Sequence, residues 1–158
     1  MQTVYIETTI PSYLGAQPSS QPRIAADQQA THAWWNRDRV RFRLYTSIFT
    51  LNEAGRGDPK AAARRLDFLR DIPELNLPSE LPRIEGDIIR LFQLPARAVV
   101  DASHLALAVL HRIDFLLTWN CAHLANAAVQ KELMEYCMYH GLHVPIVCTP
   151  EALTQIAS

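Results

Sequence analysis

Short apolar runs alternate with longer amphipathic stretches along nearly the whole chain, and this alternation constrains the fold more than any other feature. Runs rich in β-branched and aromatic residues predict buried strands, whereas apolar residues at helical spacing predict helices. Strands that alternate with helices are typical of an α/β domain whose parallel sheet is covered on both faces. The strands we expect are 4–6, 43–46, 114–118 and 145–148, with a short edge strand at 74–77.

The stretches between these runs carry the usual signals for the beginning and end of helices. Asp58 and Pro59 form an N-cap followed by a proline at the first helical position, and Gly141 is a stop signal. The helices we expect are 8–14, 24–40, 47–54, one beginning at Pro59, 81–92, 99–111, 126–140 and a short last one beginning at Pro150. The whole pattern predicts a sheet of about four to five strands in a single domain, 1–158.

Composition supports one core and leaves nucleic acid open as a partner. Of the 158 residues 49% are hydrophobic, which is enough to bury a core, and 15 basic residues nearly balance 16 acidic ones. A near-neutral chain does not point to nucleic acid by its net charge, but a local basic rim can suffice. The arginines at positions 37, 39, 41 and 43 can either bind phosphate or form a solvated basic edge.

The cysteines and the first residues bear on the compartment. Three cysteines without a framework spacing favour a reducing environment. The sequence begins without a basic, apolar leader pattern, and no apolar stretch approaches the length of a membrane span. We therefore expect a cytoplasmic protein without a membrane segment.

Acidic and amide side chains recur where a parallel sheet places its working site, beyond the carboxyl ends of the strands. Glu7 directly follows the first strand, and Glu53 lies in the helix after the second. Asp101 begins the alanine-rich helix before the third strong strand, and Asn120 comes just after that strand. Carboxylates gathered from separate elements repel one another unless a hard cation such as Mg²⁺ or Mn²⁺ lies among them. Such a metal can generate hydroxide and stabilise the oxygens of a displacement at phosphorus.

Each of these residues also has an ordinary explanation when it is taken alone. Glu53 is typical of a solvated helix position, Glu7 of the surface end of a strand, and Asp101 of an acid at a helix N-terminus. Asn120 is typical of a turn. Their joint placement at one end of the expected sheet favours a shared site.

The same segments resemble the PIN domain family, particularly the VapC-like toxins of bacterial toxin–antitoxin pairs. The resemblance covers nearly the whole chain, and its most specific part is the stretch 101–106 followed at the right distance by a strand ending in Thr118. It implies a Rossmann-like sheet and a Mg²⁺- or Mn²⁺-dependent endoribonuclease acting on single-stranded RNA. It also implies a homodimer and an antitoxin partner that blocks the site.

The resemblance assigns the metal-binding and catalytic positions to Glu7, Glu53, Asp101 and Asn120. The family usually has Asp at the first of these positions and commonly Asp at the fourth. Because Asn120 keeps an oxygen but removes a charge, a PIN-like module that binds RNA or a protein without cutting is the alternative.

Other polar and aromatic residues of the sequence are candidates for supporting or partner-binding roles. We expect Thr8 and Thr118 to support the site, Thr8 by orienting a ligand carboxylate or by satisfying an amide at the helix start. His104 lies on the same helical face as Asp101. We expect it either to be a hydrogen-bonded histidine in the core or at its boundary, or to form a hydrogen bond near the site. For the pair Trp34 and Trp35 we expect at least one ring in the core, and the other is a candidate for contact with a partner.

Overall fold

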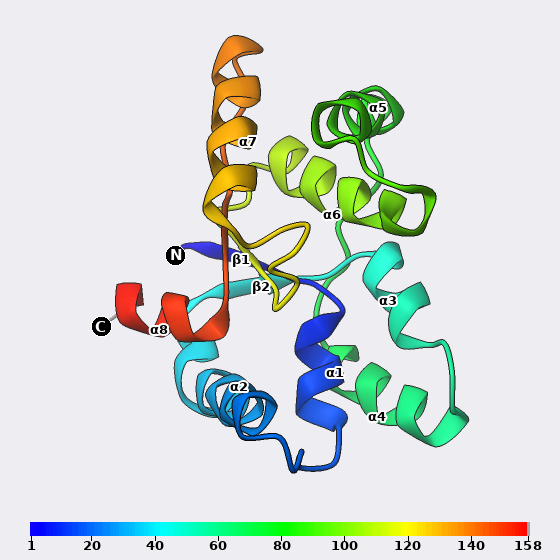
Figure 1. Cartoon of the computed structure of the whole chain (residues 1–158), viewed down its shortest axis with the longest axis vertical. Coiled ribbons are helices and arrows are strands. Elements are labelled where there is room, and N and C mark those ends of the chain that lie inside the picture. The colour runs from blue at the N-terminus through cyan, green and yellow to red at the C-terminus, as the bar shows by residue number, and fades with distance from the viewer. Residues whose placement is uncertain (158) are drawn as a thin grey trace.

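The computed structural model describes residues 1–157, and the side chains of residues 1–154. It is an α/β fold built on a four-stranded sheet in which every neighbouring pair is parallel, in the order β2–β1–β3–β4 (Figure 1). The strands are β1 (Thr3–Ile6), β2 (Arg43–Tyr45), β3 (Phe115–Leu117) and β4 (Ile146–Cys148). The expected α/β class, with a Rossmann-like parallel sheet and helices on both faces, is therefore confirmed.

Helices connect the strands and lie at the predicted places. They are α1 (Thr9–Gly15), α2 (Pro22–Ala33), α3 (Ile48–Ala54), α4 (Pro59–Leu69), α5 (Leu81–Phe92), α6 (Val99–Leu110), α7 (Ala127–Tyr139) and α8 (Pro150–Ala157). Side chains cap α3, α4, α7 and α8, because Ser47, Asp58, Asn126 and Thr149 each accept a hydrogen bond from an amide in the first turn. Gly141, at a φ of 66°, follows α7 in the left-handed region, as expected of a stop signal.

Two predicted elements differ from the structure. The helix expected at 24–40 ends as a regular α-helix at Ala33 and continues as a π-helix (Trp34–Asp38) and a 3-10 turn (Arg39–Arg41). The edge strand expected at 74–77 is reduced to one parallel bridge between Thr46 and Glu74. Pro73 precedes that bridge and Pro78 follows it, so prolines limit further pairing on both sides.

Side chains of the strands alternate between two apolar layers on opposite faces of the sheet. Tyr5 and Leu116 belong to the layer that packs against α5, α6 and α7, while Val4, Ile6 and Phe115 belong to the layer of α1, α4, α8 and the π-helix at Trp34–Asp38. The two-residue period of a strand produces this division. Apolar side chains make up most of both layers, and the polar residues that follow the strands lie at the sheet's ends.

Both tryptophans of the expected pair are buried in the second layer. Trp34 is fully buried and Trp35 is 6% exposed, with its ring edge-to-face against Phe68. The expectation of at least one ring in the core is confirmed, and the second ring is buried as well. The homodimer stays a prediction, without support from this pair.

No helix within residues 1–157 combines the length and the apolar character that a membrane crossing requires. The three cysteines are unpaired: Cys121 is exposed, and Cys137 and Cys148 are buried.

Candidate metal centre

Glu7 leaves the carboxyl end of β1 with a nearly buried side chain, 4% exposed. Its Oε1 atom accepts three hydrogen bonds: from the backbone N–H of Thr9 at 3.0 Å, the hydroxyl of Thr9 at 2.5 Å and the hydroxyl of Thr118 at 2.6 Å. Thr118 directly follows β3, the neighbour of β1 in the sheet. Two adjacent strand ends therefore fix the orientation of this carboxylate.

Glu53 reaches the same end of the sheet from α3. Its Oε1 atom accepts a hydrogen bond from the Thr8 hydroxyl at 2.5 Å and lies 2.9 Å from Nε2 of His104. The expectation that Thr8 orients a ligand carboxylate agrees with this contact. Ligand atoms of Glu7, Glu53 and His104 all lie within 4.8 Å of one another.

His104 stands in the middle of α6 and is fully buried. Its Nδ1 atom lies 2.7 Å from the hydroxyl of Tyr5, which in turn lies 2.5 Å from the hydroxyl of Ser47. The histidine thus connects the carboxylate of Glu53 to the buried hydroxyls of Tyr5 and Ser47. It is both a satisfied core histidine and a neighbour of the site, the two interpretations that its position in the sequence left open.

Asp101 lies outside this set of ligand atoms, but close enough to Glu7, Glu53 and His104 for their charges to shift its pKa. Asp101 is in the first turn of α6, is 7% exposed, and accepts a hydrogen bond on Oδ2 from the Asn120 amide at 3.3 Å. The Oδ1 atom of Asn120 accepts the backbone N–H of His123 at 3.1 Å. Asn120 therefore acts as a turn residue and as a hydrogen-bond donor to the acid.

The pKa values reflect this crowding. Burial raises the pKa of Asp101, and the nearby charges of Glu7 and Glu53 raise it further, against the opposing effect of His104. Burial alone would also raise the pKa of Glu53, but the hydrogen bonds from His104 and Thr8 outweigh it and the pKa is lowered. Burial would lower the pKa of His104, yet Tyr5, Glu53 and Glu7 together raise it to about 10. The imidazolium therefore compensates part of the negative charge.

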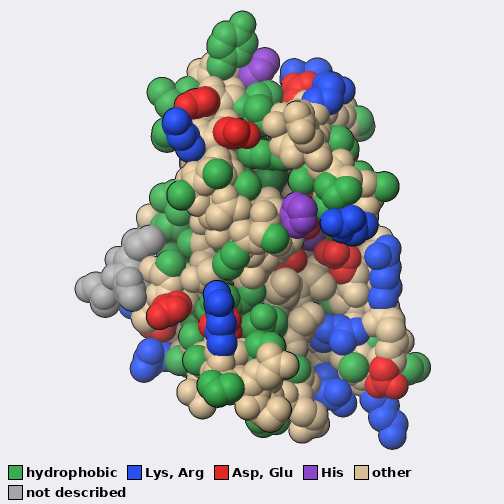
Figure 2. Space-filling view, viewed as in Figure 1, with side chains coloured by type: hydrophobic (Ala, Val, Ile, Leu, Met, Phe, Trp, Pro, Cys, Tyr) green, Lys and Arg blue, Asp and Glu red, His purple; other side chains and the backbone are tan. Residues whose placement is uncertain are grey.

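The donor set fits a hard divalent cation. In each of Glu7, Glu53 and Asp101, one carboxylate oxygen receives the hydrogen bonds described above, and the other has no hydrogen-bond partner among the side chains of residues 1–154. Mg²⁺ and Mn²⁺ prefer carboxylate oxygens as ligands. The hydrogen bonds to one oxygen of each carboxylate hold its other oxygen in place for such an ion. On the surface, acidic and histidine side chains gather between α3, α6 and the loop after β3, with Lys and Arg side chains on the side of α3 and α4 (Figure 2).

Two contributors were not anticipated from the sequence. Thr9 donates to Glu7 through both its amide and its hydroxyl, and that hydroxyl also accepts the backbone N–H of Trp119 at 2.8 Å. Tyr5 was expected only as a strand residue, although its hydroxyl supports His104. The contact of Thr9 could have been predicted from its position two residues after Glu7, where its hydroxyl can form a local hydrogen bond in a turn.

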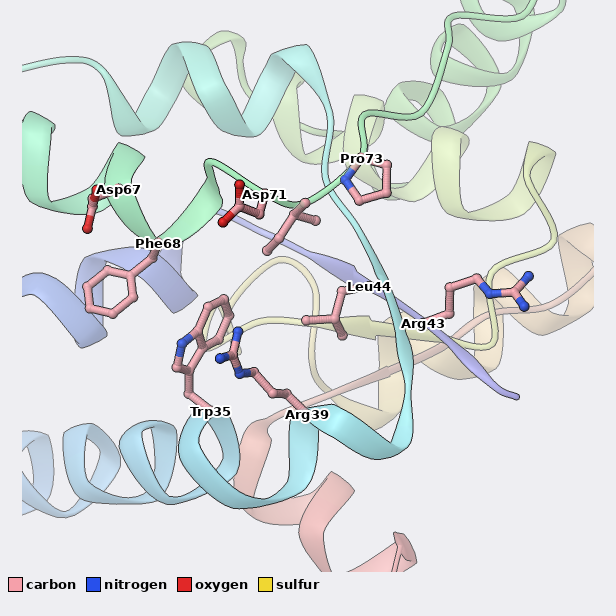
Figure 3. Close-up of a pocket in the computed structure, with 9 residues that line it drawn as sticks. Trp35, Arg39, Arg43, Leu44, Asp67, Phe68, Asp71 and Pro73 are labelled. Atoms are coloured by element: carbon pink, nitrogen blue, oxygen red, sulfur yellow. The ribbon is translucent and has the colours of Figure 1, made fainter.

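The four arginines at positions 37, 39, 41 and 43 do not all have the same partner and do not form one binding surface. Arg37 and Arg41 lie 3.8 Å and 3.6 Å from carboxylate oxygens of Asp38, and Arg39 lies over the Trp35 ring, 4.7 Å from its centroid. Arg39 and Arg43 line a pocket of about 500 Å³ beside β2, where Arg43 points away from Trp35 (Figure 3). This pocket lies beside Asp67 and Asp71, apart from the acids that follow the strands.

The sequence matches no protein-family model and no curated protein.

Proposed function

We propose that this protein is a metal-dependent endoribonuclease of the PIN type that cleaves single-stranded RNA, with Mg²⁺ or Mn²⁺ held by Glu7, Glu53 and Asp101. The observation that carries the proposal is the set of three acids from separate elements, each with one oxygen held by the protein and one left over. When bound there, the cation would lower the pKa of a water molecule and offset the negative charge of a phosphate.

The chain's own residues do the positioning. Thr9 and Thr118 fix Glu7, while Thr8 and His104 fix Glu53, so neither carboxylate needs to reorganise when a phosphate arrives. Charged histidine beside Glu53 limits the repulsion among the acids. Arg56 lies close enough to Glu53 to lower the pKa of that carboxyl, and it offers a positive charge to an approaching RNA backbone.

A non-catalytic RNA- or protein-binding module is the second candidate, and Asn120 favours it. This residue stands where a fourth acid would add charge, and both polar atoms of its side chain are engaged with Asp101 and His123. A site with three acids attracts a second cation less than a site with four.

Cleavage of a fluorescent single-stranded RNA by purified protein distinguishes the two candidates. The nuclease requires cleavage with Mn²⁺ that stops with EDTA and that falls at least about tenfold in Glu7→Gln, because a ligand charge is lost. Glu132→Gln, an exposed acid on α7, is the matched control and should cleave like the wild type. RNA binding without chelator-sensitive cleavage would support the module and remove the nuclease.

We also propose that the protein acts in the cytoplasm as the toxin of a toxin–antitoxin pair and forms a homodimer. The support is the resemblance of residues 101–106 and of the strand ending in Thr118 to VapC-like toxins. Induced expression in a bacterial host tests the toxin: growth should stop with the wild type and continue with Asp101→Asn. Sedimentation at micromolar concentration tests the dimer.

A further inference from the structure

A pocket of about 490 Å³ opens beside the candidate metal centre. Its size lies in the range of roughly 300–1,000 Å³ that is usual for small-ligand sites. The lining comes from α1, α2, α8 and the turn after β3, and its residues are Tyr13, Arg23, Ile24, Asp27, Trp119, Cys121, Thr149 and Glu151. Nothing in the proposed metal chemistry uses these side chains.

Trp119 joins this pocket to the acids. It stands between Thr118, which binds Glu7, and Asn120, which binds Asp101. Its backbone N–H donates to the Thr9 hydroxyl, the same hydroxyl that donates to Glu7. The same turn, Thr118–Asn120, therefore forms part of the pocket and part of the metal centre.

The aromatic surface of the pocket is held in place. The Trp119 indole N–H donates to the hydroxyl of Thr31 at 2.7 Å. Tyr13 stacks on the indole with ring centroids 5.7 Å apart and an interplanar angle of 11°. Both rings are half-buried. A rigid aromatic surface of this kind is what single-stranded RNA bases pack against.

Charged groups of both signs border the rings. Arg23, Asp27 and Thr31 succeed one another at four-residue spacing on α2, so they share the helix face that Thr31 turns toward Trp119. Burial raises the pKa of Tyr13, and the charge of Asp27 raises it further, which reflects the closeness of that carboxylate. Among the side chains of residues 1–154, neither Arg23 nor Asp27 is in an ion pair.

We infer that this pocket binds a guanine base of the RNA substrate next to the phosphate that is cut. The inference rests on the proposed ribonuclease function, because it names the nucleotide that the same site would select. Guanine fits the charges: its N1–H and N2 amino group are adjacent donors for the Asp27 carboxylate, and its O6 and N7 are acceptors for the Arg23 guanidinium.

Other bases match this arrangement less well. In the same orientation adenine would present its N6 amino group, a donor, to Arg23 and its N1 atom, an acceptor, to the Asp27 carboxylate. Uracil has a single ring donor and a smaller surface for the aromatic wall. A correct bidentate contact is worth enough to discriminate by about tenfold or more.

Nucleotide binding in EDTA tests the pocket without any cleavage. Guanosine monophosphate should quench the fluorescence of Trp119, and it should bind at least about tenfold tighter than adenosine monophosphate. The quenching should vanish in Trp119→Phe, which identifies the reporter because Trp34 and Trp35 are buried. Asp27→Asn should abolish the preference for guanine, whereas Asp71→Asn, an exposed acid at the pocket of Figure 3, should keep it.

The possible outcomes separate this inference from the nuclease itself. Equal affinity for the two nucleotides, or a guanine preference that survives Asp27→Asn, overturns the guanine pocket. Wild-type cleavage of random single-stranded RNA with Mn²⁺ should map to sites with guanine at one fixed position beside the cut. Metal-dependent cleavage without that preference would contradict the guanine pocket but support the ribonuclease function. Selective guanine binding without cleavage would support the guanine pocket and contradict the ribonuclease function.

Discussion

The Nε2 atom of His104 lies 2.9 Å from Oε1 of Glu53, and the histidine is fully buried while the carboxylate is half-exposed. This pair connects the apolar layer under α6 to the acidic end of the sheet. A buried imidazole with polar partners on both nitrogens is costly to leave unpaired.

Removing the ring should therefore destabilise the fold. His104→Ala removes one of the hydrogen-bond partners of the Tyr5 hydroxyl and of Glu53 and leaves a cavity, and we expect a loss of about 2–4 kcal/mol in the free energy of unfolding. His104→Gln keeps a side-chain N–H donor and should lose less. Urea unfolding in EDTA measures both, and an alanine variant as stable as the wild type would show that the pair contributes nothing.

The same pair predicts a pH dependence of stability. The pKa of His104 is raised in the folded state to about 10, so its contribution is complete below the unfolded value of about 6.5 and is lost as the pH rises toward 10. The pKa of Glu53 is lowered, so its contribution is lost as the pH falls through the folded value. We expect the metal-free protein to lose stability between about pH 6.5 and 10, and His104→Gln to lose less.

The comparison with His104→Gln is needed because other groups act in the same range. Burial raises the pKa of the Cys137 and Cys148 thiols, so their ionisation in the unfolded chain also lowers stability above about pH 8.5. That contribution is common to both proteins. Parallel stability curves for the two proteins would reject a charged His104.

Local pattern predicted most of the fold. The strand at Val4–Ile6 and the helix that ends before Gly141 follow from apolar spacing and stop signals, which the chain carries within a few residues. The change from α to π geometry at Trp34 was not predictable this way, because it depends on seating two adjacent indoles in one layer.

The acids of the candidate site and the supporting residues Thr8 and Thr118 could be predicted from the sequence, whereas Thr9 and Tyr5 were not anticipated. Glu7 and Asp101 could be found because a parallel sheet brings its carboxyl ends to one edge. The contact from Thr118 to Glu7 requires β3 to lie beside β1, and the contact from Tyr5 to His104 requires particular side-chain rotamers. Neither the strand order nor a rotamer is written in the local pattern.

Neutralising Asp101 should separate stability from metal binding. Because burial and the neighbouring acids raise its pKa, the charge is unfavourable in the metal-free protein. We expect Asp101→Asn to raise the free energy of unfolding in EDTA by about 0.5–2 kcal/mol and to weaken Mn²⁺ binding at least about tenfold. Calorimetric titration and urea unfolding check the two effects, and unchanged Mn²⁺ affinity would remove Asp101 from the metal centre.

A fourth acid at position 120 should have the opposite effects on stability and on Mn²⁺ affinity. Asn120→Asp exchanges the 3.3 Å hydrogen bond to Asp101 for repulsion between two carboxylates, so the metal-free protein should lose stability. Mn²⁺ should bind the variant more tightly and raise its melting temperature more than it raises that of the wild type. Equal Mn²⁺ affinity in both proteins would place Asn120 outside the coordination shell, as a turn residue alone.

Thr9 offers the sharpest test of how the site is held, because its hydroxyl binds both the Glu7 carboxylate and the turn at Trp119. It donates to Glu7 at 2.5 Å and accepts the backbone N–H of Trp119 at 2.8 Å. Thr9→Val has nearly the same shape but can do neither, so Glu7 keeps only Thr118 and the Thr9 amide as donors. We expect weaker Mn²⁺ binding, and a loss of about 1–3 kcal/mol in the free energy of unfolding because the Trp119 amide loses its partner.

Thr9→Ser is the matched control, since it returns the hydroxyl and removes only a methyl group. Serine should recover both Mn²⁺ affinity and most of the stability, as calorimetric titration and urea unfolding would measure. If valine lowers stability but leaves Mn²⁺ affinity unchanged, the hydroxyl supports only the turn at Trp119. If serine fails to recover the affinity that valine loses, the methyl packing of Thr9, rather than its hydrogen bond, orients Glu7.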